Sequence, residues 1–182
     1  MNSPIRTFVC AVCLAIAAFP ASSVAALTAY MTVQGATQGD IQGDCDQAGR
    51  ENTHIVYERN HLIGSMVDSA TGLPTGELKH HPYVVRKKNN QGSPLLYQAM
   101  ATGEVLQVVI DVYRITEMGK EEKYFTYRLN NARIVDIHST TLHVVLDENK
   151  ARPDEEVVAF VYESIVIRNN ILGTEATIVV SP

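Results

Sequence analysis

Residues 104–115 constrain the fold more than any other stretch of the chain. In this segment, EVLQVVIDVYRI, aliphatic residues recur at every second position, namely Leu106, Val108, Ile110 and Val112. A two-residue period is typical of a β-strand with one buried face, because successive side chains of a strand point to opposite faces. The opposite face is mixed in polarity and consists of Val105, Gln107, Val109, Asp111 and Tyr113. We therefore predict a strand that is partly covered on both sides.

Strand-like segments recur along the chain after Ala26, separated by turn residues. We expect strands at residues 28–35, 53–64, 81–88, 104–115, 123–137 and 157–167, a short strand at 141–146 and a β-prone segment at 175–180. Seven or eight strands with intervening turn signals and one helix are typical of an antiparallel sandwich or barrel. The sequence predicts a mainly β protein, a compact antiparallel β-barrel or sandwich with one short α-helix packed on its side.

Two segments between these strands have the composition of loops. Residues 36–52, ATQGDIQGDCDQAGREN, show no apolar periodicity. Residues 65–80, SMVDSATGLPTGELKH, bring Gly72, Pro74 and Gly76 close together, and these residue types favour bends. Loops of this length are uncommon in compact domains and are often functional. We therefore expect residues 65–80 to do more than connect two strands.

The segment SPLLYQAMATGE, residues 93–104, has the signals of a short and sharply bounded helix. Ser93 is a favourable N-cap, Pro94 suits the first helical position, and Gly103 supplies a left-handed stop. The apolar face consists of two pairs at i,i+4 spacing, Leu95 with Ala99 and Leu96 with Met100. We expect these four residues to pack the helix against an end or side of the sheet that the strands leave open.

The first 25 residues have the layout of a secretory signal peptide. One positive residue, Arg6, precedes an apolar run from Phe8 to Phe19, and Ser23 and Ala25 then occupy the −3 and −1 positions of a cleavage site. The run is too short to span a bilayer comfortably. We expect cleavage after Ala25. The alternatives are a start codon assigned too far upstream and an uncleaved anchor.

Charge and cysteine content argue against a nucleic-acid-binding protein and against a disulfide-stabilised scaffold. The formal net charge of −5 argues against nucleic acid as a partner. Two of the three cysteines, Cys10 and Cys13, lie in the apolar run, so cleavage leaves Cys45 alone and no intrachain disulfide can form. We therefore expect the β core alone to stabilise the fold.

Few residues have the spacing of a catalytic or metal site. The candidate catalytic or metal-binding side chains are Cys45; Asp40, Asp44 and Asp46; His80 and His81; and His138 and His143. A calcium loop that starts at Asp44 fails, because Ala48 occupies a ligand position and Glu51 comes too early. Adjacent histidines in a strand point to opposite faces and cannot easily share one ion. We expect no catalytic, cofactor or metal site, and we interpret Cys45 as a bystander thiol.

Five segments, taken in order, carry a resemblance to a known family. AYMTVQGATQGDI contains a short strand followed by G-x-T-Q-G, and DSATGLPTGELKHHPYVV is similar to S-G-x-P-S-G-x-x-x-H-x-P followed by a strand. The other three are SPLLYQAMATGEVL, KYFTYRLNNARIVDIH and EEVVAFVYESIVI. In this order and spacing, over residues 27–168, they resemble the start, extended loop, helix, long strand and penultimate strand of Hcp. Hcp is the tube-forming protein of bacterial type VI secretion systems.

The resemblance implies a compact β-barrel with one helix on its side, six copies of which form a ring, and rings that stack into a hollow tube. It also implies sheath proteins that drive the tube outward, a VgrG-type spike protein that caps it, and effector proteins that travel in the lumen. The extended loop would reach a neighbouring ring, with Ser65, Asp68, Gly72, Leu73, Pro74 and Gly76 as ring-stacking residues. The protein would be secreted and would act without a cofactor and without enzymatic activity.

Two segments depart from the family pattern. Hcp proteins usually carry no cleaved signal peptide, because the tube assembles in the cytoplasm, whereas residues 1–25 are signal-like. Residues 169–182 form a β-prone tail without a clear counterpart, which delimits an Hcp-like barrel domain at residues 26–168. The alternative interpretation is a monomeric β-barrel, exported to the periplasm or beyond, that keeps the fold but acts as a binding or adhesion module.

Overall fold

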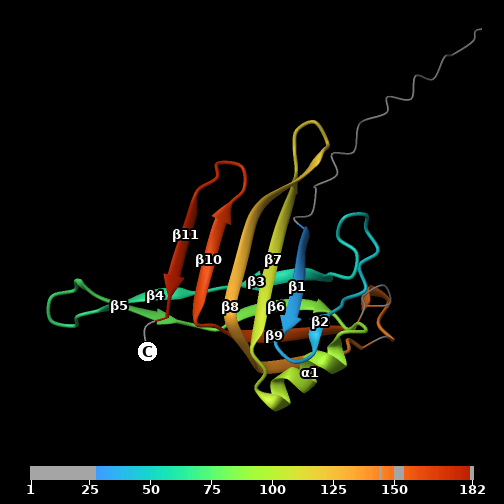
Figure 1. Cartoon of the computed structure of the whole chain (residues 1–182), viewed down its shortest axis with the longest axis horizontal. Helices are drawn as coiled ribbons and strands as arrows, with labels where there is room; N and C mark the ends of the chain where they lie inside the picture. The colour runs from blue at the N-terminus through green and yellow to red at the C-terminus, as the bar shows by residue number, and fades with distance from the viewer. Residues whose placement is uncertain (1–27, 144, 150–153, 181–182) are drawn as a thin grey trace, which may run out of the picture.

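The computed structural model describes residues 28–143, 145–149 and 154–180 of the 182-residue chain (Figure 1). Six strands close into an antiparallel barrel. In order around it they are β8 (Glu121–Thr140), β7 (Leu106–Ile115), β1 (Thr28–Gly35), β3 (His54–Asn60), β6 (Tyr83–Lys88) and β9 (Glu155–Val161). A second pairing between β9 and β8 closes the circle. The predicted fold class, a mainly β barrel with one short helix, is confirmed.

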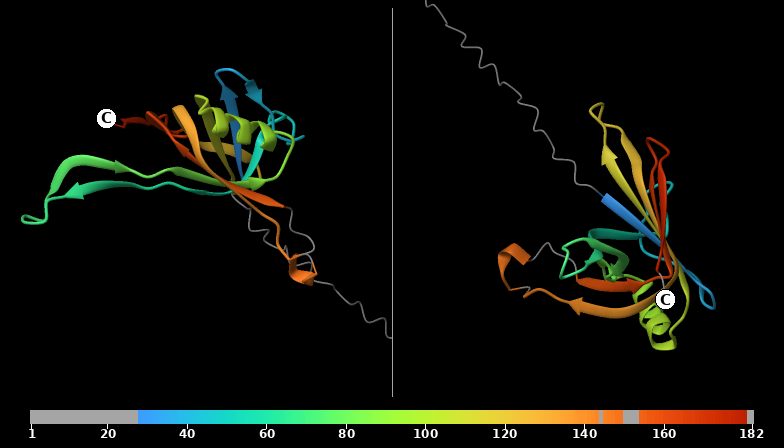
Figure 2. Two further views of the ribbon diagram at one scale, coloured as in Figure 1. Left: turned by 90° about the horizontal axis from the view of Figure 1, so that it is seen from below. Right: turned by 90° about the vertical axis from the view of Figure 1, so that its left-hand side faces the viewer.

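The remaining strands lie outside the barrel. They are β2 (Gly39–Ile41), which pairs with β1, and β10 (Ser164–Asn169) and β11 (Glu175–Val179), which continue the sheet from β8. β4 (Ile63–Val67) and β5 (Pro74–His80) form a separate two-stranded sheet, hereafter the ribbon, which projects away from the barrel (Figure 2). A 3-10 turn, η1 (Asp147–Asn149), and the helix α1 (Ser93–Thr102) complete the described elements.

Alternation along the strands places the hydrophobic core inside the barrel. The aliphatic residues of β7 with the two-residue period all face inward and are buried, as predicted. They pack with inward-facing residues of the other strands, including Met31, Val85, Leu129, Val158 and Phe160. Removal of this apolar surface from water is the main contribution to the stability of the barrel.

The segment at residues 157–167, predicted as one strand, is divided between β9 and β10. β8 pairs with both of them and continues across the break, where Asn130 lies opposite Ser164. The ladder bends at this point, because Asn131 has a positive φ of 49° and its side-chain amide donates to the Glu163 carboxylate at 2.7 Å. A bend of this kind leaves the apolar character of the segment unbroken, so the sequence pattern did not reveal it.

Three loop and strand boundaries also differ from prediction. Residues 65–80 do not form an irregular loop but most of the ribbon, and residues 36–52 include the short strand β2. The strand predicted at residues 141–146 is wrong for the described residues of that segment, which contain none, because β8 ends at Thr140 and its partner β9 begins at Glu155. In each case strand pairing, rather than local apolar content, decides the outcome.

The helix α1 begins differently from prediction. Its N-cap is Gly92, and Ser93 is the first helical residue, with its hydroxyl directed to the buried Glu156 carboxylate at 2.7 Å rather than to the helix backbone. Pro94, predicted at the first helical position, is the second residue of the helix, and Gly103 ends the helix with a left-handed φ of 65°, as predicted.

The apolar face of α1 is narrower than predicted. Leu96 and Ala99 are fully buried and Met100 packs partly buried against the core. Leu95 is 37% exposed, so its expected place on the packing face is wrong. Leu95 lies about 100° around the helix from Leu96, which turns it away from the barrel.

A signal-like segment was predicted at the N-terminal end of the chain and a β-prone tail at the C-terminal end. The signal-like segment, residues 1–25, lies outside the described residues. Part of the C-terminal tail forms β11, which pairs with β10 at the end of the barrel's sheet. Over the ranges that the structure describes, no helix has the length and apolar character needed to cross a bilayer.

Candidate functional site

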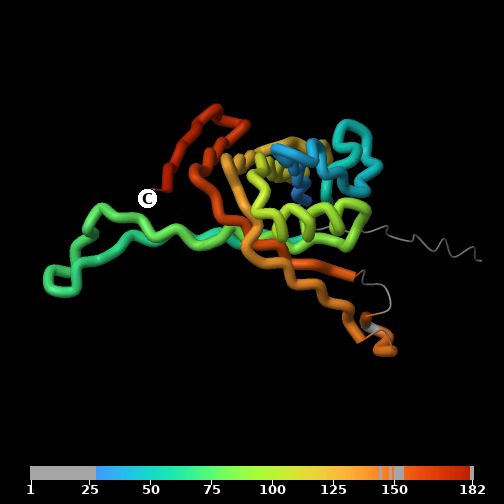
Figure 3. Tube along the Cα trace, turned by 60° about the horizontal axis from the view of Figure 1, so that its bottom comes forward, coloured from blue at the N-terminus to red at the C-terminus, as the bar shows by residue number. Residues whose placement is uncertain are grey.

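The ribbon is the most exposed regular element of the described chain. Every residue of β5 before His80 is exposed, and β4 is exposed from Ser65 onward. In Figure 3 the ribbon extends far from the barrel, in a direction different from the distal ends of β8 and β9. Two-stranded hairpins are at best marginally stable in water, because they bury little apolar surface. A ribbon of this length is therefore suited to contact another surface.

The sequence-predicted residues of the ribbon lie along its length. Ser65 is in β4, Pro74 begins β5, and Leu73 lies at the tip with 65% of its surface exposed. Asp68 organises the tip, since one of its carboxylate oxygens accepts hydrogen bonds at 2.8 Å from the backbone N–H groups of Ala70 and Thr71. The structure thus brings these residues into one projection and gives Asp68 a clear local role.

Two glycines permit the ribbon's backbone path. Gly72 and Gly76 have φ values of 70° and 88°, a region that side-chain-bearing residues rarely adopt. Gly72 lies in the tip turn, and Gly76 lies within β5, whose pairing with β4 shifts register between Ser65 and Val67. Their conformations explain why the segment resembled a loop in sequence.

The ribbon exposes a large amount of apolar surface. Its exposed large hydrophobic residues are Met66, Val67, Leu73 at the tip and Leu78, and the exposed Leu62 immediately precedes β4. Single exposed hydrophobic residues are ordinary, but a group on one projecting hairpin marks an interaction surface. The ribbon therefore has the composition of a docking element.

Three aromatic side chains meet at the root of the ribbon, where it leaves the barrel. His61 precedes β4, His80 ends β5, and Tyr162 lies between β9 and β10. The Tyr162 hydroxyl lies 2.7 Å from His61 Nε2 and 3.2 Å from His80 Nδ1. Burial raises the pKa of Tyr162 to about 12, so its hydroxyl is neutral under all ordinary conditions. This group, hereafter the root triad, joins the ribbon to the barrel wall.

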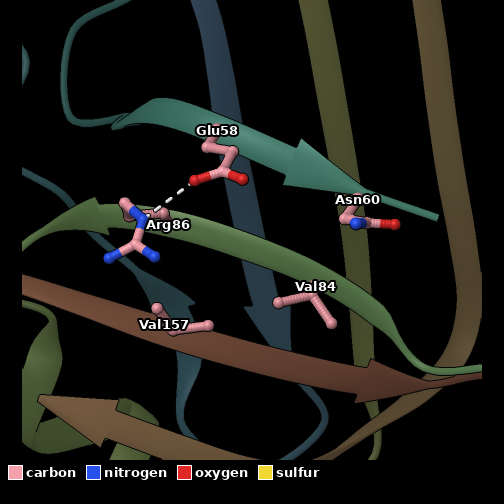
Figure 4. Close-up of a pocket in the computed structure, with 5 residues that line it drawn as sticks. All are labelled: Glu58, Asn60, Val84, Arg86 and Val157. Atoms are coloured by element: carbon pink, nitrogen blue, oxygen red, sulfur yellow. Dashed lines mark hydrogen bonds and ion pairs between the residues drawn. The ribbon is translucent and has the colours of Figure 1, made fainter.

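A second exposed surface is the outer face of β3, β6, β9 and the distal half of β8. Antiparallel register places Glu58, Arg86, Val157 and His138 in one row across the four strands. Arg86 donates to the Glu58 carboxylate at 3.0 Å and to Glu155 at 3.3 Å. Figure 4 shows the shallow hollow on this face, lined by Glu58, Asn60, Val84, Arg86 and Val157.

The same face has an apolar component. Alternation along β9 turns Val157, Ala159 and Val161 outward, and Val84 of β6 lies directly opposite Ala159. Apolar side chains flanked by ion pairs are typical of protein–protein interfaces, where charged groups surround an apolar centre. We call this the outer face. It offers a second surface for contact with protein.

The most deeply buried polar group of the described chain lies elsewhere, under α1. Lys87 and Glu156 form an ion pair at 2.5 Å with almost no exposure, and Ser93 donates to the same carboxylate oxygen. Lys87 also donates to the side-chain carbonyl of Asn90 at 3.2 Å. Because these polar atoms satisfy one another, the group has the character of a structural anchor for β6, β9 and α1. The ion pair was not predicted from the sequence, although Lys87 follows Tyr83 and Val85 at inward-facing positions.

His54 extends this anchor to the segment before β3. Its Nε2 lies 2.9 Å from the Ile41 carbonyl, which can only accept, so Nε2 carries the proton and Nδ1 accepts from the Asn90 amide at 3.1 Å. Burial and the nearby Lys87 lower the pKa of His54 to about 4. His54 is therefore a neutral structural residue.

The side chains considered earlier for catalysis or metal binding are dispersed. Cys45 is buried, and Asp44 forms an ion pair with Lys88 at 3.1 Å. Within residues 28–143, 145–149 and 154–180, no three His, Cys, Asp or Glu side chains are placed to hold a metal ion. The geometry of the described residues instead directs attention to the ribbon and the outer face.

Comparison with known proteins identifies the family. The family model described as type VI secretion system effector, Hcp, matches residues 30–168. The chain belongs to the Hcp family. It is therefore a secreted protein of the type VI secretion system, and the resemblance inferred from the sequence motifs is confirmed.

Individual relatives agree with this assignment. The Major exported protein of Pseudomonas aeruginosa is 34% identical over 145 residues, which cover 79% of this chain and 84% of the relative. A crystal structure of an Hcp protein superposes with a TM-score of 0.81 at 26% identity and covers 86% of this chain and 99% of the other. The secreted protein Hcp3 of Pseudomonas aeruginosa superposes with a TM-score of 0.68 at 29% identity, over 86% and 100% of the two chains.

Proposed function

We propose that this Hcp protein is a non-enzymatic structural subunit of the type VI secretion inner tube. Six copies form a ring, rings stack into a tube, and effector proteins are carried in or exported with it. The single observation that carries the proposal is the family barrel combined with a long exposed ribbon that has no partner surface within the described chain. By the same family logic, sheath proteins and a VgrG-type spike protein are the further partners.

The ribbon is the element that we assign to contacts between rings. It projects beyond the barrel and presents the apolar tip residue Leu73 on a turn held by Asp68. Burial of its exposed apolar side chains against a second copy would stabilise both the contact and the ribbon itself. Ser65, Asp68, Gly72, Leu73, Pro74 and Gly76 are the proposed ring-stacking residues.

The outer face and the free edge of β11 are the surfaces that we assign to contacts within a ring. A head-to-tail contact uses two different surfaces of each copy and closes into a ring when the rotation is complete. The edge of β11 has unpaired backbone groups in the described chain, and the outer face has outward valines beside Arg86. A stable interface of this kind buries on the order of 1,200 Å² or more.

The test of the proposal is the native mass of the full chain over a wide concentration range. The monomer has a mass of 20.0 kDa, and removal of a signal peptide would lower it. We expect a species of six times the monomer mass that survives dilution, and rings in negative-stain electron microscopy. A monomer at every concentration would contradict the proposal and would favour the exported monomeric binding or adhesion module.

A further inference from the structure

The root triad joins three elements through one hydroxyl group. His61 precedes β4, His80 ends β5, and Tyr162 occupies the bend between β9 and β10. The His61 ring also packs against the ring of Tyr83 of β6, tilted by 32° with the centroids 4.8 Å apart, and the Tyr83 side chain is fully buried. Both ends of the ribbon are therefore tied to the barrel wall at a single point.

The number of protons on the triad decides whether every donor in it has an acceptor. A tyrosine hydroxyl donates one hydrogen bond and accepts others, whereas a protonated imidazole only donates. With neutral rings, one histidine accepts from the Tyr162 hydroxyl and the other donates to it. With two protonated rings, both donate to the same oxygen, and the hydroxyl proton loses its acceptor within the triad.

The charges around His61 oppose a second proton. The ring nitrogens of His61 and His80 that face Tyr162 are at most about 6 Å apart, since both lie within hydrogen-bond distance of its oxygen. Arg59 of β3 adds a third positive charge, held at 4.4 Å over the ring of Tyr127 on β8. Burial lowers the pKa of His61, and His80 and Arg59 lower it further.

The surroundings of His80 provide no hydrogen-bond acceptor for its second ring nitrogen among the described residues. Its Nδ1 faces Tyr162, while its Nε2 is buried and has no hydrogen-bond partner among the described residues. A proton on Nε2 would place a buried N–H donor without an acceptor beside two other positive charges. Among the described residues, the titratable and charged groups beside the two imidazoles are Arg59, Tyr83, Tyr127 and Tyr162, and none of these four is a carboxylate.

We propose that the root triad is a pH-sensitive latch, which holds the root of the ribbon on the barrel when both imidazoles are neutral and releases it when both are protonated. Lowering the pH below about 6.5 protonates free imidazoles, so the released form gains population on acidification. If the ribbon joins rings, as proposed above, acidification shortens or separates ring stacks. Only this last consequence depends on the proposed function.

The direct readout is the protection of backbone amides at the root against hydrogen exchange, measured on the full chain at pH 7.5 and pH 5.5. The His81 N–H, which donates to the Leu62 carbonyl at 3.1 Å, reports on the root. Protection factors remove the intrinsic pH dependence of exchange. We expect the wild-type factor to fall at pH 5.5, by up to about tenfold for each imidazole, because a free imidazole with a pKa near 6.5 favours the released form by at most that factor one pH unit lower.

The matched variant replaces each histidine by the amide that copies the nitrogen it uses. His61→Gln places an amide near the position of Nε2 and His80→Asn places one near Nδ1, and neither side chain titrates. The double variant should keep equal protection at both pH values. His143→Gln, which removes an exposed histidine beyond the end of β8, should behave as the wild type. Tyr162→Phe removes the shared hydroxyl and should lower protection at pH 7.5 to the wild-type value at pH 5.5.

Equal wild-type protection at both pH values would overturn the latch, and so would a double variant that follows the wild type. If the double variant does not fold, Tyr162→Phe with unchanged protection at pH 7.5 would overturn it equally. Sedimentation of ring stacks at the same two pH values tests the consequence. Absence of rings at either pH, together with the expected protection changes, would refute the proposed function and leave the latch supported.

Discussion

Strand β6 of the barrel and strand β5 of the ribbon are similar in length but obey opposite rules of burial. In β6, inward-facing Tyr83, Val85 and Lys87 are fully buried and alternate with outward-facing residues. In β5, no residue is buried, and the two-stranded sheet has no other element paired to either edge within the described chain. The barrel is therefore stabilised by its own buried side chains, whereas the ribbon exposes apolar surface that is available to another molecule. Substitutions should separate these two roles.

The largest effect should follow from breaking the buried ion pair of the barrel. Lys87→Met leaves the Glu156 carboxylate buried without its cation and should lower the free energy of unfolding by about 3–5 kcal/mol. Lys88→Met removes an exposed partner of Asp44 and should lower the free energy of unfolding far less, because exposed ion pairs contribute little to stability. Urea unfolding of both variants measures the difference. Equal stability of the two would show that the buried pair does not anchor the barrel.

The helix offers a second contrast between buried and exposed side chains. Leu96→Ala should lower the free energy of unfolding by about 2–5 kcal/mol, because Leu96 is fully buried and its loss leaves a cavity. Leu95→Ala, on the exposed side of α1, should change it by less than about 1 kcal/mol. The comparison is made by thermal and urea unfolding. A larger effect of Leu95→Ala would mean that Leu95, and not Leu96, lies on the face of α1 that packs against the barrel.

Acidification should destabilise the barrel through His54. Because burial lowers the pKa of His54 to about 4, the folded state binds fewer protons than the unfolded state between pH 6.5 and pH 4. The free energy of unfolding should therefore fall as the pH drops through this window, by up to about 3 kcal/mol. His54→Gln should flatten that dependence. An unchanged slope in the variant would mean that other groups cause the acid sensitivity.

The ribbon should show the smallest effect on stability and a selective effect on assembly. Leu73→Ser should change the free energy of unfolding by no more than about 0.5 kcal/mol, because Leu73 is exposed at the tip. It should nevertheless weaken ring stacking. Leu172→Ser, at an equally exposed leucine in the turn between β10 and β11, is the matched control and should leave stacking unchanged. Sedimentation of both variants at equal concentration makes the comparison.

The barrel could be predicted from sequence because burial of one strand face requires an apolar residue at every second position. β1 was predicted with the observed boundaries, and β7 with the observed inward face, since one side of each must be apolar. The ribbon has no buried face, so its strands lacked that period and resembled a loop. The bend between β9 and β10 was missed for a related reason, because its cause lies in Asn131 on another strand.

The candidate site was predictable only in part. Gly72, Pro74 and Gly76 marked the ribbon as unusual from their composition, and the family resemblance suggested its role. The root triad was not foreseen, because His61, His80 and Tyr162 are far apart in sequence and meet only through the pairing of β4 with β5 and of β6 with β9. The adjacent His80 and His81 were considered only as metal ligands, and Tyr162 was predicted to lie within one continuous strand at residues 157–167.

The division of roles between barrel and ribbon is tested most directly by removing the ribbon and leaving its root in place. Ser65 lies opposite Leu78 in the ribbon's ladder, so residues 66–77 can be replaced by Asn-Gly, a two-residue hairpin turn. Electron microscopy and sedimentation of this variant should show single rings that no longer stack, with the free energy of unfolding unchanged to within about 1 kcal/mol. Stacks as long as those of the wild type, or loss of the folded barrel, would contradict the division of roles between barrel and ribbon.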